Sequence, residues 1–287
     1  MTPLSIAIGH DNDVYILLVN EHPPLVNGSF PATITEESYY YQVIYVKDGQ
    51  KTVLHLPNET WNYHHVQPID NDHVLLVCAR SYYHDASNIE ENARVYDKNG
   101  SFVRSFCLGD GIGKVYVTKD QEIWTGYFDE GVFGNYGWEK PIGRSGLVGW
   151  NASGVQIDSL EDDKQYAIFE CLALNGTAHG QIIFFFSIDA KFGIRKDNRT
   201  EYYSTEDIAF RGAFAVKGDK IVAHQGISGR ILFELKRIEN EFKTVRKIEL
   251  IKPDGQPVIP QLVNNREDKL LFLDGDELYL YEMKSGD

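Results

Sequence analysis

The sequence predicts an all-β protein, and two observations support this. Apolar and polar residues alternate in short runs around turn residues, as in "VIYVKDGQKTVLHL" and "LFLDGDELYLYE". Each such run is typical of two strands joined by a tight turn. Helical periodicity is almost absent, while 17 Tyr and 15 Phe supply the aromatic residues that sheets favour.

The expected strands form a repeated unit, in which a strand A turns into a strand B, a loop follows, and a C–D hairpin ends the unit. We expect A strands at 4–8, 64–69, 112–117, 167–174, 209–216 and 258–263. The B strands follow at 14–19, 73–78, 122–127, 180–187, 220–224 and 269–273. The C–D hairpins lie near 40–56, 93–107, 146–158, 191–203 and 230–249, and the last one, from 277, is incomplete.

Six such units, each about 40–60 residues long, predict a β-propeller, whose blades are four-stranded sheets. The prediction is six blades with an incomplete last blade. Five closed blades with an irregular sixth, and a large β-sandwich, are the alternatives. Residues 1–287 are assigned to a single domain, since the chain contains no linker, charge block or low-complexity tract.

Composition narrows the classes of partner. The formal net charge is −14, which argues against a nucleic acid or an anionic membrane surface as a partner. The first residues, "MTPLSIAIGHDNDVYILLVN", lack a basic region and an unbroken apolar run, so we expect no signal peptide and no membrane span. Three scattered cysteines without a CxxC spacing favour reduced thiols in the cytoplasm. The six N-x-S/T sequons, which include Asn175, are therefore expected to be turn asparagines.

Residues 95–131, "VYDKNGSFVRSFCLGDGIGKVYVTKDQEIWTGYFDEG", and residues 145–154, "SGLVGWNASG", resemble the blade junctions of bacterial propellers of the NHL-like type. In these families a strand ends, a "D-x-x-G" hairpin follows, and the next blade reads "V…D…IW". The resemblance is to uncharacterised members of the group. It implies the six-bladed fold and brings no activity with it.

Function is expected on the face where the B–C loops and D–A links of a propeller emerge, because these segments are long and rich in unusual residues. One of them, "YFDEGVFGNYGW" at 127–138, combines two carboxylates, five aromatic residues and three glycines. Topology would bring the candidate ligand-binding residues to one channel mouth: Asp129, Glu130, Tyr136, Trp138, Arg80, His84, Trp61, His64, His65, Arg144, Arg211 and His224. Tyr63, Tyr82, Tyr83 and Asp85 would lie with them.

Several types of chemistry remain open for this set. Aromatic faces beside carboxylates suit sugars or aromatic ligands. Asp129 and Glu130 are neighbours in an expected extended segment, so they should point to opposite faces and not act as a catalytic pair with each other. Zinc would need histidines and acids from several blades, and no local spacing requires it. The loop could also merely stabilise itself, with its carboxylates accepting backbone hydrogen bonds.

The sequence therefore favours a monomeric, non-catalytic binding module without a metal or cofactor. Its partner would be an unknown protein, a small molecule or a carbohydrate. The alternative is a carbohydrate-active hydrolase or lyase, in which an acid, a histidine and an arginine meet across the channel mouth.

Overall fold

The structure of this chain is a computed structural model that describes residues 1–26, 32–161, 165–186, 190–205, 212–226 and 229–284. Strands account for 57% of it and helix for 3%, which confirms the all-β prediction. The chain divides into two compact units, Met1–Phe169 and Glu170–Asp287. In the ranges described, no helix has the length and apolar character needed to cross a membrane.

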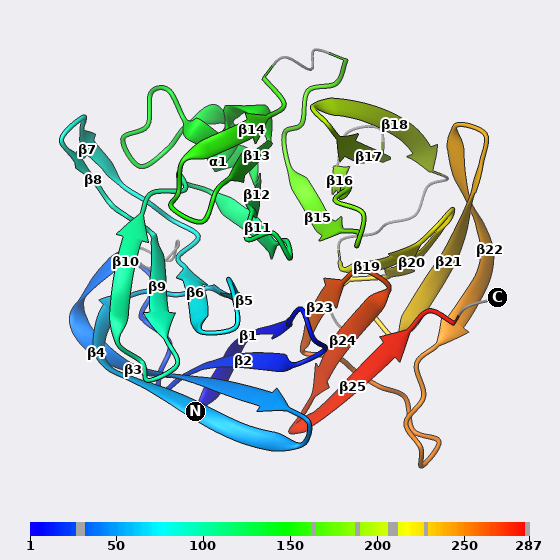
Figure 1. Cartoon of the computed structure of the whole chain (residues 1–287), viewed down its shortest axis with the longest axis horizontal. Helices are drawn as coiled ribbons and strands as arrows, with labels where there is room; N and C mark the ends of the chain where they lie inside the picture. The colour runs from blue at the N-terminus through cyan, green and yellow to red at the C-terminus, as the bar shows by residue number, and fades with distance from the viewer. Residues whose placement is uncertain (27–31, 162–164, 187–189, 206–211, 227–228, 285–287) are drawn as a thin grey trace. The chain divides into compact units, whose positions relative to one another are not determined.

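The first unit contains three four-stranded antiparallel sheets (Figure 1). The first sheet is β1 (Thr2–Ile8), β2 (Val14–Val19), β3 (Ile34–Lys47) and β4 (Gln50–Trp61). The second is β5 (His65–Pro68), β6 (His73–Val77), β9 (Ala93–Asp97) and β10 (Phe102–Phe106). Between β6 and β9 in the chain, a separate small hairpin consists of β7 (Tyr83–Asp85) and β8 (Asn88–Ile89). The third is β11 (Ile112–Val117), β12 (Ile123–Tyr127), β13 (Leu147–Trp150) and β14 (Gln156–Ser159), with α1 (Asp129–Phe133) and the 3₁₀ turn η1 (Ile142–Ser145) between β12 and β13.

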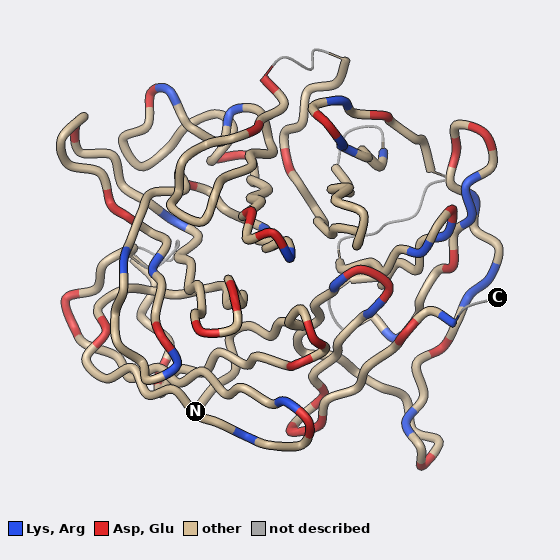
Figure 2. Tube along the Cα trace, in the orientation of Figure 1, with Lys and Arg blue, Asp and Glu red and all other residues tan. Residues whose placement is uncertain are grey.

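The turns form where the sequence supplies turn chemistry. Between β9 and β10, the Asp97 carboxylate accepts hydrogen bonds from the backbone N–H groups of Asn99 and Ser101, both at 2.8 Å. Gly100 has a φ of +82°, a conformation that glycine adopts without cost. The "D-x-x-G" signal therefore forms the predicted hairpin. Asp and Glu residues recur at turns and strand ends of both units, as Figure 2 shows.

Apolar layers lie between successive sheets of the first unit. One layer contains Leu17, Val43 and Leu76 from the first two sheets, and another contains Leu75, Val117 and Val148 from the second and third sheets. All six are 0% exposed, and the neighbouring residues Leu75 and Leu76 of β6 are buried against different sheets.

The second unit begins with an eight-stranded sheet that consists of two consecutive antiparallel meanders. The first meander is β15 (Cys171–Gly176), β16 (Ile182–Phe186), β17 (Lys191–Lys196) and β18 (Arg199–Thr205). The second is β19 (Phe214–Lys217), β20 (Lys220–His224), β21 (Ile231–Ile238) and β22 (Glu241–Glu249). Among the residues described, two pairs, Ser204 with Glu241 and Thr205 with Phe242, join them in parallel. A three-stranded sheet follows, β23 (Leu262–Arg266), β24 (Lys269–Asp274) and β25 (Glu277–Glu282).

Some details of the sheets differ from the sequence-based prediction. The first C–D hairpin is longer than expected, because β4 runs on to Trp61, which pairs with Ile34 despite the poor alternation of "PNETW". Asn175 is not a turn residue, since it is fully buried in β15 and bonded to backbone groups of other strands. Backbone pairing and tertiary contacts decide both positions.

Candidate functional site

A surface cleft of about 790 Å³ lies in the first unit. One wall is the β7 hairpin, and the other is the loop that follows α1. Its volume is in the range of about 300–1,000 Å³ that ligand sites occupy. We call it the aromatic cleft; its lining residues are Tyr82, Tyr83, His84, Asp85, Gly137, Trp138, Glu139 and Lys140.

Direct hydrogen bonds hold the two walls together. The backbone N–H of Tyr83 donates to the carbonyl of Tyr136 at 2.9 Å, and the indole N–H of Trp138 donates to the carbonyl of Ser81 at 2.8 Å. Between them Gly137 has a φ of +83°, and a Cβ atom there would lie 2.1 Å from the Tyr83 carbonyl oxygen. Only glycine fits this approach, so the sequence of the loop fixes the shape of the cleft.

The aromatic residues of the cleft differ in their access to a ligand. Tyr82 and His84 stack with their ring centres 4.5 Å apart and an angle of 27° between the ring planes. Tyr82 is 39% exposed, whereas Trp138 is 7% exposed and packs 5.0 Å from the ring of Tyr83. Tyr82 and His84 are therefore available for contact with a ligand, while Trp138 supports the wall.

A buried arginine lies two residues before Tyr82 of this cleft in the chain. Arg80 is 1% exposed, and its Nε and one terminal nitrogen donate to the two carboxylate oxygens of Asp110, both at 2.8 Å. Its other terminal nitrogen donates to Glu130. Burial by itself would lower the pKa of Arg80, but the bonds and charges of Asp110 and Glu130 outweigh this effect and raise it, so the guanidinium stays charged.

Tyr136 links the buried arginine to the loop. Its ring lies 3.9 Å from the guanidinium carbon of Arg80, a cation–π contact. Tyr136 also has a φ of +48°, which is uncommon for an aromatic residue and costs conformational energy. The stacking on Arg80 helps to offset that cost, and so ties the loop conformation to the ion pairs.

The expectation of an extended segment at residues 129 and 130 is wrong, because the short helix α1 begins at Asp129. The two acids nevertheless have different partners. Glu130 binds Arg80, while the Asp129 carboxylate accepts the backbone N–H of Glu130 at 2.9 Å. One acid is paired with a buried arginine and the other accepts the backbone N–H of its neighbour.

His64 and His65 also diverge. The Nδ1 atom of His64 accepts the backbone N–H of Ala79 at 3.1 Å, and Nε2 of His65 lies 3.4 Å from the carbonyl of Ile112. Burial lowers the pKa of His64 to about 4, with a smaller contribution from Arg80. Burial lowers the pKa of His65 to about 3, helped by the charges of His64 and Lys114. Both histidines are neutral in the folded protein at neutral pH.

These shifts predict a pH dependence of stability. The unfolded chain binds protons at these histidines below about pH 6.5, whereas the folded chain does so only near pH 4 for His64 and pH 3 for His65. Their contribution is therefore complete above about pH 6.5 and is lost as the pH falls through this window. Urea denaturation of the wild type and of the double variant His64→Gln/His65→Gln, from pH 7 to 4, should show the smaller loss of stability in the variant. Equal slopes would contradict the assignment.

None of the other candidates that the structure describes lines the aromatic cleft. Arg94 stacks over Trp61 at 5.1 Å, and Arg144 forms an exposed ion pair with Glu161. His224 is buried in β20 of the second unit, with Nε2 2.5 Å from the carbonyl of Gly229. Arg211 lies outside the described residues. Within the ranges that the structure describes, no three His, Cys, Asp or Glu side chains come together in a way that could hold a metal ion.

Asp110 is the site residue that the sequence analysis missed. It lies in "GDGIG" between Gly109 and Gly111, both with positive φ. It binds Arg80 and also accepts the backbone N–H of Ser81 at 2.9 Å. The sequence did offer one signal, a carboxylate between two glycines in a segment whose other residues suggest burial. Its partner Arg80, however, is 30 residues away in the chain.

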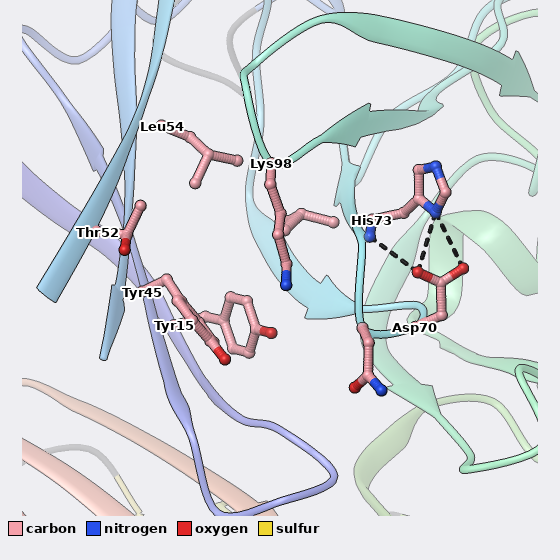
Figure 3. Close-up of a pocket in the computed structure, with 9 residues that line it drawn as sticks. Tyr15, Tyr45, Thr52, Leu54, Asp70, His73 and Lys98 are labelled. Carbon is pink, nitrogen blue, oxygen red and sulfur yellow. Dashed lines mark hydrogen bonds and ion pairs between the residues drawn. The ribbon is translucent and has the colours of Figure 1, made fainter. Parts of the chain in front are cut away.

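A second, smaller cavity of about 130 Å³ lies between the first two sheets. Figure 3 shows Lys98 between the rings of Tyr15 and Tyr45 on one side and the Asp70–His73 pair on the other. The Nδ1 atom of His73 is 2.9 Å from the nearer Asp70 oxygen. Since one water takes about 30 Å³, this cavity suits a few waters and not a ligand of the size that the aromatic cleft admits.

Comparison with solved structures identifies the fold as that of β-propeller proteins. YCF48 bound to the D1 peptide has a TM-score of 0.52 at 9% identity, over 99% of this chain and 94% of that one. Hsv2 of Kluyveromyces lactis has a TM-score of 0.52 at 9% identity, over 99% and 75%. A catalytically inactive virginiamycin B lyase from Staphylococcus aureus with quinupristin has a TM-score of 0.50 at 11% identity, over 98% and 84%.

At these identities the likeness extends to the fold alone. No protein-family model matches the chain. No curated protein matches it either. The chain therefore has the fold of β-propeller proteins, a group that includes both binding proteins and enzymes.

Proposed function

We propose that this protein is a non-catalytic binding module that holds an extended peptide segment of a partner protein in the aromatic cleft. One observation carries the proposal: the cleft exposes aromatic and charged side chains, while its two walls are joined by hydrogen bonds and Tyr136 of one wall stacks on the buried Arg80. A rigid site loses less conformational entropy when it binds. Tyrosine with mixed charges is a composition typical of protein-binding surfaces.

The acids argue for binding rather than catalysis. A hydrolase of the kind considered above needs an acid free to donate or accept a proton at the substrate. Glu130 is paired with the buried Arg80, and Asp129 lies outside the lining of the cleft. YCF48, which has a similar fold, is bound to a peptide in its solved structure, and this is consistent with peptide binding by such a scaffold.

The remaining parts of the proposal are the number of blades, the oligomeric state and the cellular location. We propose six blades, since the eight-stranded sheet is two meanders joined by only two residue pairs, and the last blade has three strands. We also propose a monomer in the cytoplasm of a bacterium, on the strength of the free cysteines and of the resemblance to bacterial propellers.

The test is a selection of phage-displayed random peptides of about 12 residues on the full chain, followed by fluorescence-polarisation titration. The selected peptides should bind the Tyr82→Ala and Gly137→Ala variants about tenfold more weakly, the first through loss of a contact and the second through loss of the wall geometry. The control is Phe102→Ala, which removes an exposed aromatic side chain of β10 outside the cleft. Equal affinity for the wild type and Tyr82→Ala would contradict the proposal.

A carbohydrate-active hydrolase or lyase is the second candidate, since Asp85 and Glu139 line the same cleft as the stacked Tyr82 and His84. A panel of neutral and acidic oligosaccharides tests it by thermal shift, because a ligand that binds only the folded state raises the melting temperature. Two results together would favour this second candidate over the first. One is a rise in melting temperature that disappears in Tyr82→Ala, and the other is release of sugar reducing ends that disappears in Asp85→Asn.

A further inference from the structure

Two carboxylates line the aromatic cleft, one from each wall. Asp85 ends β7, Glu139 lies in the loop that follows α1, and both residues are exposed. Within the part of the chain that the structure describes, neither carboxylate is ion-paired with a lysine or an arginine. The hydroxyl and the backbone N–H of Ser87 donate to Asp85 at 2.6 and 2.7 Å and hold the pKa of Asp85 below its usual range. The cleft therefore presents charged acids that are available to a ligand.

The charge around the cleft favours a cationic ligand. The lining residues include one lysine, Lys140, against these two acids. Over a longer range, the first unit holds 11 of the 28 Lys and Arg residues and 23 of the 42 Asp and Glu residues, so it carries 12 of the 14 net negative charges of the chain. A concave site in such a surface attracts cations and repels anions.

Tyr82 adds an exposed aromatic ring that is held in place. Its backbone N–H donates to the Glu90 carboxylate at 2.8 Å, and its carbonyl accepts the backbone N–H of Glu90 at 3.0 Å. Its ring stacks on that of His84, and 39% of the residue is exposed. A cation placed over the face of such a ring is attracted by the negative potential of the π system.

The same combination of groups already holds an arginine inside this molecule. The guanidinium carbon of Arg80 lies 3.9 Å from the ring centre of Tyr136. The guanidinium nitrogens donate to the carboxylates of Asp110 and Glu130. A planar guanidinium stacks on a ring and donates to carboxylates along its edge at the same time, whereas the ammonium group of lysine acts as a point charge. A tyrosine ring with two carboxylates in the cleft therefore suits arginine better than lysine.

We propose that the aromatic cleft selects peptide segments that contain an arginine, whose guanidinium stacks on Tyr82 and pairs with Asp85 and Glu139. This inference rests on the proposed function and adds the chemical class of the bound segment. A segment with an acidic residue at the same place would meet two like charges and is disfavoured.

The test starts from the peptides selected on the full chain and keeps those that bind Tyr82→Ala more weakly than the wild type. We expect these peptides to share an arginine. Replacing it by citrulline, which keeps the shape and removes the charge, should weaken binding about tenfold in fluorescence-polarisation titrations. Replacing it by lysine should weaken binding by about threefold, because the charge remains and the stacked fork is lost.

Exposed cleft residues supply matched variants of the protein. Glu139→Gln and Asp85→Asn should each weaken the arginine peptide severalfold and leave the citrulline peptide unchanged, whereas Lys140→Gln should strengthen the arginine peptide by removing a like charge.

The inference is overturned if the arginine and citrulline peptides bind equally well, if the Tyr82-dependent peptides lack arginine, or if Glu139→Gln weakens both peptides alike. The proposed function survives each of these results. A selection that yields no Tyr82-dependent peptide contradicts the proposed function itself, and this inference with it.

Discussion

Replacing Arg80 by alanine is expected to lower the free energy of unfolding by about 3–5 kcal/mol, the range for breaking a buried ion pair by removing one partner. Asp110 would remain buried with its charge uncompensated, and Tyr136 would lose the guanidinium on which it stacks. Guanidinium denaturation of the full chain measures the effect.

The matched control is Arg144→Ala. Arg144 also pairs with a glutamate, Glu161, but 58% of its side chain is exposed, and exposed pairs contribute about 0–1 kcal/mol. A loss below about 1 kcal/mol for Arg80→Ala, similar to that of Arg144→Ala, would show that the buried network does not hold this part of the fold.

The second large effect is expected at Asn175. Its amide nitrogen donates to the carbonyls of Phe214 and Glu267, at 2.7 and 3.0 Å, and its oxygen accepts the backbone N–H groups of Gly176 and Glu267, at 2.8 and 2.9 Å. One side chain thereby joins β15 to the starts of β19 and of the β23–β24 turn. Asn175→Ala would leave several buried backbone groups unsatisfied, at about 1–3 kcal/mol each, so we expect a loss of about 3 kcal/mol or more.

Asn151→Ala serves as the comparison, because Asn151 has the same side chain in an exposed turn, where it accepts the N–H groups of Ser153 and Val155. Water can replace those bonds, and the expected loss is about 1 kcal/mol or less. Equal losses at the two asparagines, measured by urea denaturation, would contradict the role assigned to Asn175.

Strand positions could be predicted from the sequence because they depend on local chemistry. The hairpin at Asp97–Gly100 combines an Asx turn with a glycine of positive φ, and both signals lie within a few residues. The strand β25 could likewise be foreseen, since "ELYLYE" is a run of aromatic and aliphatic residues directly after a turn.

The site was less predictable because its contacts join distant residues. Arg80 meets Asp110 and Glu130, which are 30 and 50 residues away in the chain. No periodicity encodes such a pairing, and Glu130 reaches Arg80 from a helix of five residues that the sequence analysis took as extended. Gly137 is one of the three glycines of "YFDEGVFGNYGW", but the close approach of Tyr83 that requires a glycine there depends on the fold.

Hydrogen–deuterium exchange of the full chain, with and without a peptide selected on it, tests the central claim most directly. Binding slows exchange where backbone hydrogen bonds become less exposed or open less often. The account predicts protection of residues 82–85 and 136–140, the two walls of the aromatic cleft, and loss of that protection in Tyr82→Ala. Protection confined to other segments, with residues 82–85 and 136–140 unchanged, would contradict it.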